Sequence, residues 1–387
     1  MEKQRLIYWR EWHERQNRVS RKNRPPYEET GKKGIGIFSI FGYTFFMLKE
    51  NGVTIPIVFA ANEYFIPYTS AMIQSIMENA SPENQYRFFI LHSGISAVVL
   101  NMLSSQTKNY PYCIIEGINI SERIKGCNFF TANRPDITAE TYYRLYIPEL
   151  LSDYDKVIYL DGDMICRSDI SRLFAFDIGD NFIGAARDCT GISGLIRYGA
   201  YKDKTCFDFK ANARNLIDCY NAGVMIFNIR QFQKTISITE LLDLALSRKW
   251  ANHDQDILNF VTESRTFFLP YSWNFTIEEN ACYLPETLAK EYAEAERQVK
   301  IFHFAGPQRK PWKNSCFVDY AYIPYFTLFW KYAFKTPFLD TIIARMEEEH
   351  ILGGSYEPFV INQIKQRNGG ICFILKCLTA WMRRNRA

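Results

Sequence analysis

The chain has 387 residues, of which 47% are hydrophobic and 23% charged, and this composition indicates a globular protein with a large core. Its formal net charge of +4 is unevenly distributed: residues 1–33 hold ten Lys/Arg and five Asp/Glu, residues 365–387 hold six Lys/Arg and no acid, and the residues between them therefore carry −7. An acidic body with basic ends excludes a nucleic-acid binder with a basic face. The ten cysteines include no C-x-x-C pair, which excludes a zinc ribbon or a thioredoxin-type site.

Strand and helix patterns alternate along most of the chain. After an extension at 1–52, apolar runs predict strands, and apolar residues at three- and four-residue spacing predict helices. This alternation predicts an α/β fold with a largely parallel sheet and helices on both faces, over residues 53–315. In chain order we expect strand 53–61, helix 66–80, strand 86–93, helix 95–106, strand 112–120, a capped helix 138–151, strand 157–160, a strand directly after 221–223, a helix from 252 to 261 and a strand that ends at 303.

The C-terminal region, 316–387, is predicted to be helical and to end in a basic amphipathic tail. In residues 371–382 the apolar side chains recur at helical spacing, and basic residues fall on the other side. Such a helix would lie on an anionic membrane surface, although packing on the domain is the alternative. The apolar positions are Ile371, Ile374, Leu375, Leu378, Trp381 and Met382.

Two aspartates follow the strand that ends at Leu160. Asp161 and Asp163 are separated only by Gly162, and carboxylates this close repel each other unless a cation lies between them. Carboxylate oxygens suit Mg²⁺ or Mn²⁺. Ligands of open α/β sheets bind at the carboxyl ends of the strands, which is where this pair lies. A turn or a strand-end cap is the common alternative for such a sequence.

A second group of polar residues follows the strand that ends at His303. Two carboxylates and this histidine could ligate one metal ion, while Gly306 and Lys310 could hold a diphosphate, through close backbone approach and a positive charge respectively. This combination favours a reaction in which a nucleoside diphosphate leaves. Asp254 is expected to cap the helix that starts near residue 252. For a lone histidine, a packed or surface position is the usual alternative.

Six motifs follow one another along the chain: "IVFAANEY", "TAETYYRLYIPELL", "DKVIYLDGDMICRSDI", "YNAGVMIFNI", "HDQDILN" and "HFAGPQRKPW". In this order they resemble glycosyltransferase family 8, in particular the bacterial lipopolysaccharide and lipooligosaccharide glucosyl- and galactosyltransferases. The resemblance covers roughly residues 53–315. It implies the GT-A nucleotide-sugar-binding fold, Mn²⁺ (with Mg²⁺ as an option), a UDP-glucose or UDP-galactose donor and retention of configuration.

The resemblance also implies roles for single residues. Asp161, Asp163 and His303 would bind the metal, and Gln255, Asp254 and Arg144 would form the catalytic set. Asn62 stands where the family often has Asp, and Gln255 stands at the place of a nucleophile although its amide is a poor one, which favours front-face attack. The residues implied for the nucleotide sugar are Ala60, Ala61, Asn62, Tyr64, Arg144, Asp161, Gly162, Asp163, Asn221, Ala222, Asp254, Gln255, His303, Gly306 and Lys310.

These features predict a retaining, metal-dependent hexosyltransferase that acts on a saccharide, with the lipopolysaccharide core as the expected acceptor. We expect it in the cytoplasm, peripheral on the inner face of the bacterial plasma membrane, and not on nucleic acid. The main alternative is a haloacid-dehalogenase-type phosphatase with Asp161 as nucleophile. The irregular stretch 188–220 is either an acceptor loop or lid, or a surface loop without a role.

Overall fold

The computed structural model describes residues 52–131, 137–198, 216–306, 309–313 and 323–348, together with two short strands near the N-terminus. The chain divides into two compact units, residues 1–52 and 53–387. In the first unit, β1 (Ser39–Ile40) and β2 (Tyr43–Thr44) form an antiparallel pair. The predicted domain boundary at 315/316 stays a prediction, and the predicted tail helix at 371–382 lies outside the described residues.

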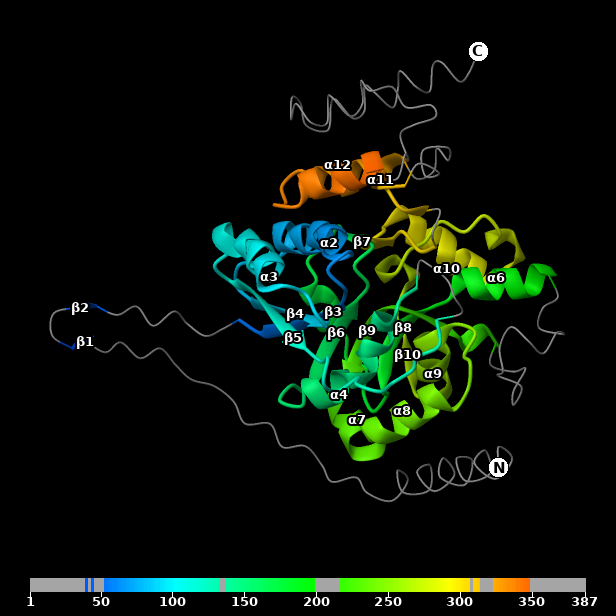
Figure 1. The fold of residues 1–387 in the computed structure, drawn as a ribbon. Helices are drawn as coiled ribbons and strands as arrows, with labels where there is room; N and C mark the ends of the chain where they lie inside the picture. The colour runs from blue at the N-terminus through cyan, green and yellow to red at the C-terminus, as the bar shows by residue number, and fades with distance from the viewer. Residues whose placement is uncertain are drawn as a thin grey trace, which may run out of the picture. The chain divides into compact units, whose positions relative to one another are not determined.

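A seven-stranded mixed sheet forms the centre of the second unit (Figure 1). All neighbouring strands run parallel, except that β9 is antiparallel to both β6 and β8. The expectation of a largely parallel sheet is therefore confirmed. In spatial order the strands are β10 (Thr266–Phe268), β8 (Ile183–Arg187), β9 (Tyr220–Asn228), β6 (Lys156–Leu160), β3 (Thr54–Ala60), β4 (Gln85–His92) and β5 (Cys113–Asn119).

Helices cover both faces of this sheet (Figure 1). The central strands are nearly continuous apolar runs because both of their faces are buried, as in residues 157–160 of β6. On one side lie α2 (Ile66–Asn79) and α3 (Ala97–Ser104). Helices α11 (Ile323–Ala333) and α12 (Leu339–Glu348) pack against α2. On the other side lie α4 (Ile147–Leu150), α7 (Ile229–Thr235), α8 (Ile238–Ser247) and α9 (His253–Val261).

A separate antiparallel pair, β7 (Met164–Cys166) with β11 (Ile301–His303), places His303 opposite Met164. Phe302 and Phe304 are fully buried and anchor this pair in an aromatic core. The remaining elements are η1 (Ser105–Asn109), η2 (Ala139–Tyr146), α5 (Ser171–Phe174), α6 (Cys189–Tyr198), η4 (Leu216–Asp218), η5 (Tyr271–Trp273), η6 (Ala281–Tyr283) and α10 (Glu286–Arg297).

The structure corrects three expectations. Residues 139–146 form the 3₁₀ helix η2 instead of an α-helix, the Thr141 carbonyl accepts a hydrogen bond from Arg144 Nε at 3.0 Å, and Thr138 makes no side-chain cap. Residues 221–223 lie inside β9, since this strand already pairs with β8 at Tyr220. Asp254 is not a cap: Asn252 holds that position, and the Asp254 side chain turns inward to Thr141 and Arg144.

Of the predicted irregular stretch 188–220, the described part contains α6 and η4, and residues 199–215 lie outside it. No helix among the described residues is long and apolar enough to cross a membrane. Six cysteines in this part of the chain are free thiols, and four of them are buried: Cys113, Cys166, Cys189 and Cys219.

Candidate active site

The carboxyl ends of three strands meet at one edge of the sheet. Asp161 follows β6, and β3 runs parallel beside it with Val58 paired to Tyr159, so Ala60 ends at the same level. Strand β8 also runs parallel to β6, because both are antiparallel to β9, and Asp188 follows it. The edge therefore collects carboxylates from two strand ends next to the place where β3 ends.

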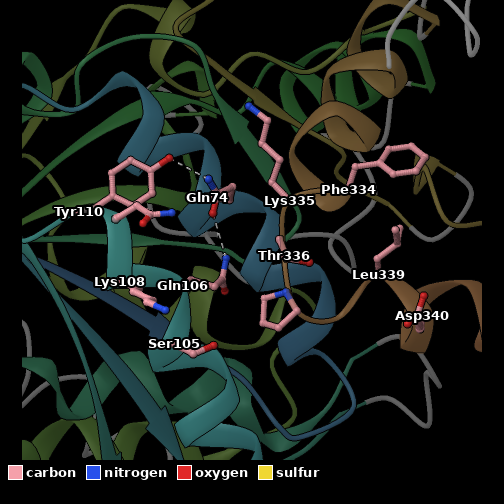
Figure 2. Close-up of a pocket in the computed structure, with 12 residues that line it drawn as sticks. Gln74, Ser105, Gln106, Lys108, Tyr110, Phe334, Lys335, Thr336, Leu339 and Asp340 are labelled. Carbon is pink, nitrogen blue, oxygen red and sulfur yellow. Dashed lines mark hydrogen bonds between the residues drawn. The ribbon is translucent and has the colours of Figure 1, made fainter. Parts of the chain in front are cut away.

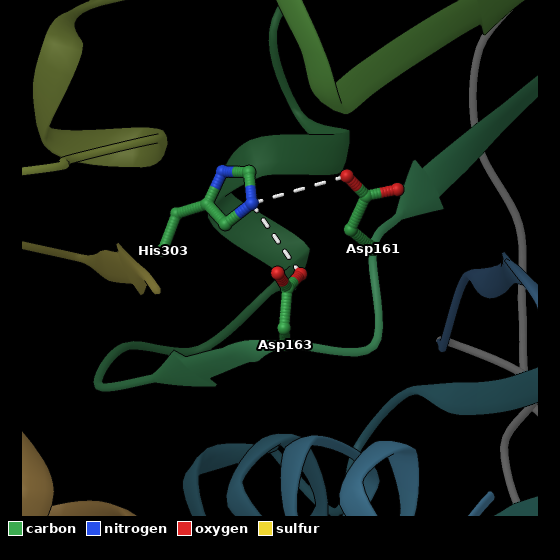
Figure 3. A group of neighbouring side chains, drawn as sticks. All are labelled: Asp161, Asp163 and His303. Atoms are coloured by element: carbon green, nitrogen blue, oxygen red, sulfur yellow. Dashed lines mark ion pairs between the residues drawn. The ribbon is translucent and has the colours of Figure 1, made fainter. Parts of the chain in front are cut away.

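Asp161, Asp163 and His303 form the cluster of metal-ligand type found among the described residues (Figure 3). One ligand atom from each residue lies within 4.8 Å of the others. His303 Nε2 is 3.3 Å from Asp163 Oδ1 and 3.9 Å from Asp161 Oδ2. Two carboxylate oxygens and one imidazole nitrogen that face one another could together hold a divalent metal ion.

The other oxygen of each aspartate is held by a cationic side chain. Asp161 Oδ1 accepts hydrogen bonds from Tyr159 Oη at 2.8 Å and from Arg144 Nη2 at 3.1 Å. Asp163 Oδ2 pairs with Lys310 Nζ. Although burial opposes ionisation, Lys310 and His303 keep the pKa of the Asp163 carboxyl well below its usual range. Lys310, expected to hold a diphosphate, therefore lies at the metal-ligand cluster itself.

Arg144 is a buried link between strands. Its guanidinium donates to the Ala222 carbonyl at 2.7 Å and to Asp161, and it stacks over the Tyr159 ring at 4.3 Å. Burial would lower the pKa of Arg144, but Asp161 and Asp254 outweigh it and raise that pKa. A buried cation with two anionic partners fixes the relative positions of η2, β6 and β9.

Asp254 lies in the first turn of α9, where it faces the interior. Its Oδ1 accepts from Thr141 Oγ1, and its Oδ2 lies 2.9 Å from Arg144 Nε. This second oxygen is buried and accepts no hydrogen bond from the described residues. Burial raises the pKa of Asp254 to about 6, against the opposing effect of Arg144. The group can therefore carry a proton at mildly acidic pH, up to about 6.

Gln255 joins the end of β8 to the start of β9. Its Oε1 accepts from the Ala222 N–H at 3.1 Å, and its Nε2 donates to Asp188 Oδ2 at 3.0 Å. Burial raises the pKa of Asp188. The sequence reasoning did not include Asp188 in the site, although the signal was present: like Asp161, it is an aspartate directly after an apolar strand.

The remaining predicted residues lie along the same edge or beside it. Asn62 Oδ1 accepts from the Phe65 N–H, so its side chain caps the turn into α2. Tyr64 is half exposed and lies under the Arg345 guanidinium of α12. Gly162 packs so tightly on α2 that an added Cβ would lie 2.2 Å from Thr69 Oγ1, whereas Gly306 adopts a φ of +90°. Ala61 donates its N–H to Leu91 at the end of β4.

A cavity of about 550 Å³ lies elsewhere, between α2, η1 and the segment that joins α11 to α12 (Figure 2). Gln74 links its walls, with hydrogen bonds to Gln106 and Tyr110. None of the predicted site residues lines it. The candidate active site is thus the open edge of the sheet and not this cavity.

Comparisons with known proteins agree with the predicted family. The model of glycosyl transferase family 8 matches residues 56–316. A lipopolysaccharide 1,2-glucosyltransferase of Escherichia coli is 25% identical over 266 residues, which cover 66% of this chain and 71% of that protein.

Solved structures show the same fold. The galactosyltransferase LgtC, in complex with donor and acceptor sugar analogs, matches with a TM-score of 0.58 and 26% identity over 73% of this chain and 96% of that one. The bifunctional glycosyltransferase WbbM matches with a TM-score of 0.64 and 25% identity over 76% of this chain, which spans about half (51%) of WbbM. The fold is therefore GT-A, and the phosphatase alternative is not supported. The chain belongs to glycosyl transferase family 8.

Proposed function

We propose that this protein transfers a hexose, glucose or galactose, from UDP-hexose to a saccharide acceptor such as the lipopolysaccharide core, with retention of configuration and with Mn²⁺ as its metal ion. The observation that carries the proposal is the cluster of Asp161, Asp163 and His303 at the sheet edge. The names of the Escherichia coli relative and of LgtC support a glucosyl or galactosyl transfer.

The metal ion would bind to Asp161, Asp163 and His303 and would supply positive charge for a departing diphosphate. The chain itself supplies the other groups. Lys310 brings a second positive charge to the same place, and the Arg144 guanidinium holds Asp161 in its orientation. Mg²⁺ could substitute, but the imidazole nitrogen favours Mn²⁺.

Front-face attack fits the residues near the sugar position. In this step the acceptor hydroxyl bonds to the anomeric carbon on the side from which UDP leaves, the carbon–oxygen bond to UDP breaks, and the hydroxyl proton passes to the departing phosphate. A covalent intermediate would need a carboxylate beneath the anomeric carbon. Gln255 offers an amide there, and its two polar atoms are already bonded to Ala222 and Asp188. The protein's work is then positioning and charge stabilisation.

The test is a panel of UDP-sugars with Mn²⁺, scored by hydrolysis and by transfer to lipid-core saccharides. We expect turnover of UDP-glucose or UDP-galactose, an α-linked product by NMR, and loss of activity in excess chelator. His303→Ala should fold normally and need far more Mn²⁺, and Asp163→Asn should lose more activity because it also removes charge.

Full activity in excess chelator would contradict the metal site, and a β-linked product would contradict retention. If His303 is only a packed side chain, His303→Ala will lower the melting temperature and leave the Mn²⁺ requirement unchanged. Measuring both quantities on one variant separates these outcomes.

We also propose that the protein works at the cytoplasmic face of the bacterial plasma membrane, held there by its basic C-terminal residues. The support is the charge pattern of the sequence, with six Lys/Arg and no acid in residues 365–387.

A further inference from the structure

A chain of three hydrogen bonds leads from a backbone N–H to the imidazole of His303. The Gly223 N–H donates to Asn221 Oδ1 at 2.9 Å, Asn274 Nδ2 donates to the same Oδ1 at 2.8 Å, and Asn274 Oδ1 lies 2.9 Å from His303 Nδ1. Asn274 and His303 are both buried, at 6% and 4% exposure. Water therefore does not compete for the bond between Asn274 and His303, whereas Asn221 is only partly buried.

Only one arrangement of protons satisfies this chain. A backbone N–H can only donate, so the atom of Asn221 that faces Gly223 must be the carbonyl oxygen. The group of Asn274 that faces this oxygen must then be the amide nitrogen, which turns the Asn274 oxygen towards His303. Because an amide oxygen only accepts, His303 Nδ1 must carry a proton. The lone pair of the neutral ring is left on Nε2, the atom that faces Asp161 and Asp163.

The backbone around this chain of hydrogen bonds holds Asn274 and His303 in place. The His303 N–H donates to the Phe275 carbonyl at 2.8 Å, and the Phe275 N–H donates to the Ile301 carbonyl at 3.0 Å. Phe275, the residue after Asn274, is therefore bonded to β11 through both its N–H and its carbonyl. At Gly223 an added Cβ would lie 2.6 Å from His303 Cε1, so the ring packs directly on the β9 backbone. The imidazole has little freedom to rotate.

We propose that Asn274 is a positioning residue that fixes the orientation and the tautomer of His303, so that Nε2 is free to bind the metal ion. The inference rests on the proposed function, in which His303 is a metal ligand. Partners of this kind orient ligating histidines in metal sites, and their removal costs roughly 10–100-fold in metal affinity.

The test compares two substitutions of Asn274 by titrating Mn²⁺ into the full-length protein in a calorimeter. Asn274→Leu removes the acceptor and should weaken Mn²⁺ binding roughly 10–100-fold. Asn274→Asp keeps an oxygen acceptor for Nδ1 but loses the donor to Asn221 Oδ1, so it should weaken Mn²⁺ binding less than Asn274→Leu does. Mn²⁺ affinity of Asn274→Leu within twofold of the wild type would overturn the proposal, as would an equal loss in both variants.

A second measurement does not depend on whether Asn274→Leu folds correctly. In ¹⁵N-histidine-labelled protein with Mg²⁺, a diamagnetic ion, long-range ¹H–¹⁵N spectra report which ring nitrogen carries the proton. The chain has five histidines, and the His303 signal is the one absent from His303→Ala. We expect the proton on Nδ1, and a proton on Nε2 with a bare Nδ1 would overturn the inference.

Failure of this inference is distinguishable from failure of the proposed function. If His303→Ala weakens Mn²⁺ binding and Asn274→Leu does not, His303 is a ligand but Asn274 does not position it. If His303→Ala leaves Mn²⁺ affinity unchanged, His303 is not a ligand, and both the proposed metal site and the proposed role of Asn274 are wrong.

Discussion

At the scale of single residues, the pKa values of two carboxyl groups of the site are shifted in opposite directions. The Asp163 carboxyl lies between Lys310 and His303, which lower its pKa despite its burial. Asp254 is buried with one oxygen that accepts no hydrogen bond from the described residues, and burial raises its pKa to about 6. Environments that separate the pKa values of neighbouring carboxyl groups are typical of sites that move protons or stabilise charge.

Asp254 should make the metal-free protein less stable as pH rises. Its pKa is about 6 in the folded chain and 3.8 unperturbed, so the folded state binds more protons between these values, and the free energy of unfolding falls as pH rises from about 4 to about 6. The loss is on the order of 3 kcal/mol. Asp254→Asn keeps the acceptor for Thr141 and should remove this loss.

Urea unfolding of the wild type and of Asp254→Asn, at several pH values between 4 and 7, measures the difference. The free energy of unfolding of the variant should increase relative to that of the wild type as pH rises, and the difference should become constant above about pH 6.5. Curves that stay parallel over the whole range would show that Asp254 titrates normally. Other buried carboxyl groups, such as Asp188, affect both proteins equally and cancel in the difference.

At the scale of elements, the site depends on how closely β9 and β11 approach each other. Gly223 allows this approach, because a Cβ there would meet His303 Cε1 at 2.6 Å and Met164 Cε at 2.8 Å. Met164 Cε is the end of a flexible side chain and can yield, but the imidazole is held by its hydrogen bond to Asn274 and by the β7–β11 ladder. The glycine is therefore required by packing and not by its backbone angles.

Gly223→Ala should accordingly lower the free energy of unfolding by about 1–3 kcal/mol, through overpacking, and should weaken Mn²⁺ binding by displacing His303. Gly194→Ala in α6 is a matched control, since nothing lies within 4 Å of its added Cβ. That change should stabilise the protein by about 0.5–1 kcal/mol, because alanine favours the helix. A Gly223→Ala protein as stable as the wild type, with unchanged Mn²⁺ affinity, would contradict this account.

The sequence predicts the sheet and the ligand cluster well for a physical reason. Buried parallel strands need continuous apolar runs, and their carboxyl ends collect at one edge, which places Asp161 beside the end of β3. His303 reaches this edge differently, because β11 lies outside the parallel sheet and pairs antiparallel with β7, the strand directly after Asp163. Local patterns failed where tertiary partners decide the conformation. Asp254 is predicted to cap its helix, but its side chain contacts Arg144 and Thr141 instead. The segment around Thr141 is predicted to be α-helical, but it forms a 3₁₀ helix.

Asp188 shares with Asp161 its position directly after an apolar strand, but this position alone does not place it at the site, and no sequence pattern points to Asn274. Asp188 reaches the site only because β8 lies two strands from β6, an order that the hydrophobic pattern does not contain. Asn274 acts through the side-chain oxygen of Asn221, 53 residues away, and no spacing in the sequence predicts such a pair. Both depend on the strand order and on how loops pack against it.

At the scale of the whole molecule, charge is segregated along the chain. The first 33 residues carry +5, the last 23 carry +6, and the residues between them carry −7. An acidic body would be repelled by an anionic membrane, so binding to such a surface would depend on the ends. Residues 371–382 combine a predicted apolar face with nearby basic residues, which is the composition of a helix that lies in a membrane interface.

Deleting residues 365–387 should therefore lower binding to anionic liposomes and spare transfer to a soluble saccharide acceptor. A second variant, in which Arg383, Arg384 and Arg386 become Gln, keeps the apolar face and separates charge from hydrophobicity. At about 1 kcal/mol per basic residue near the surface, three lost charges should weaken binding roughly 100-fold at low salt. Liposome sedimentation measures both variants, with zwitterionic vesicles as the control surface. Unchanged binding of the truncated protein to anionic vesicles would place the membrane contact elsewhere, whereas a loss of soluble-acceptor transfer in parallel would mean that the tail packs on the domain and supports its fold.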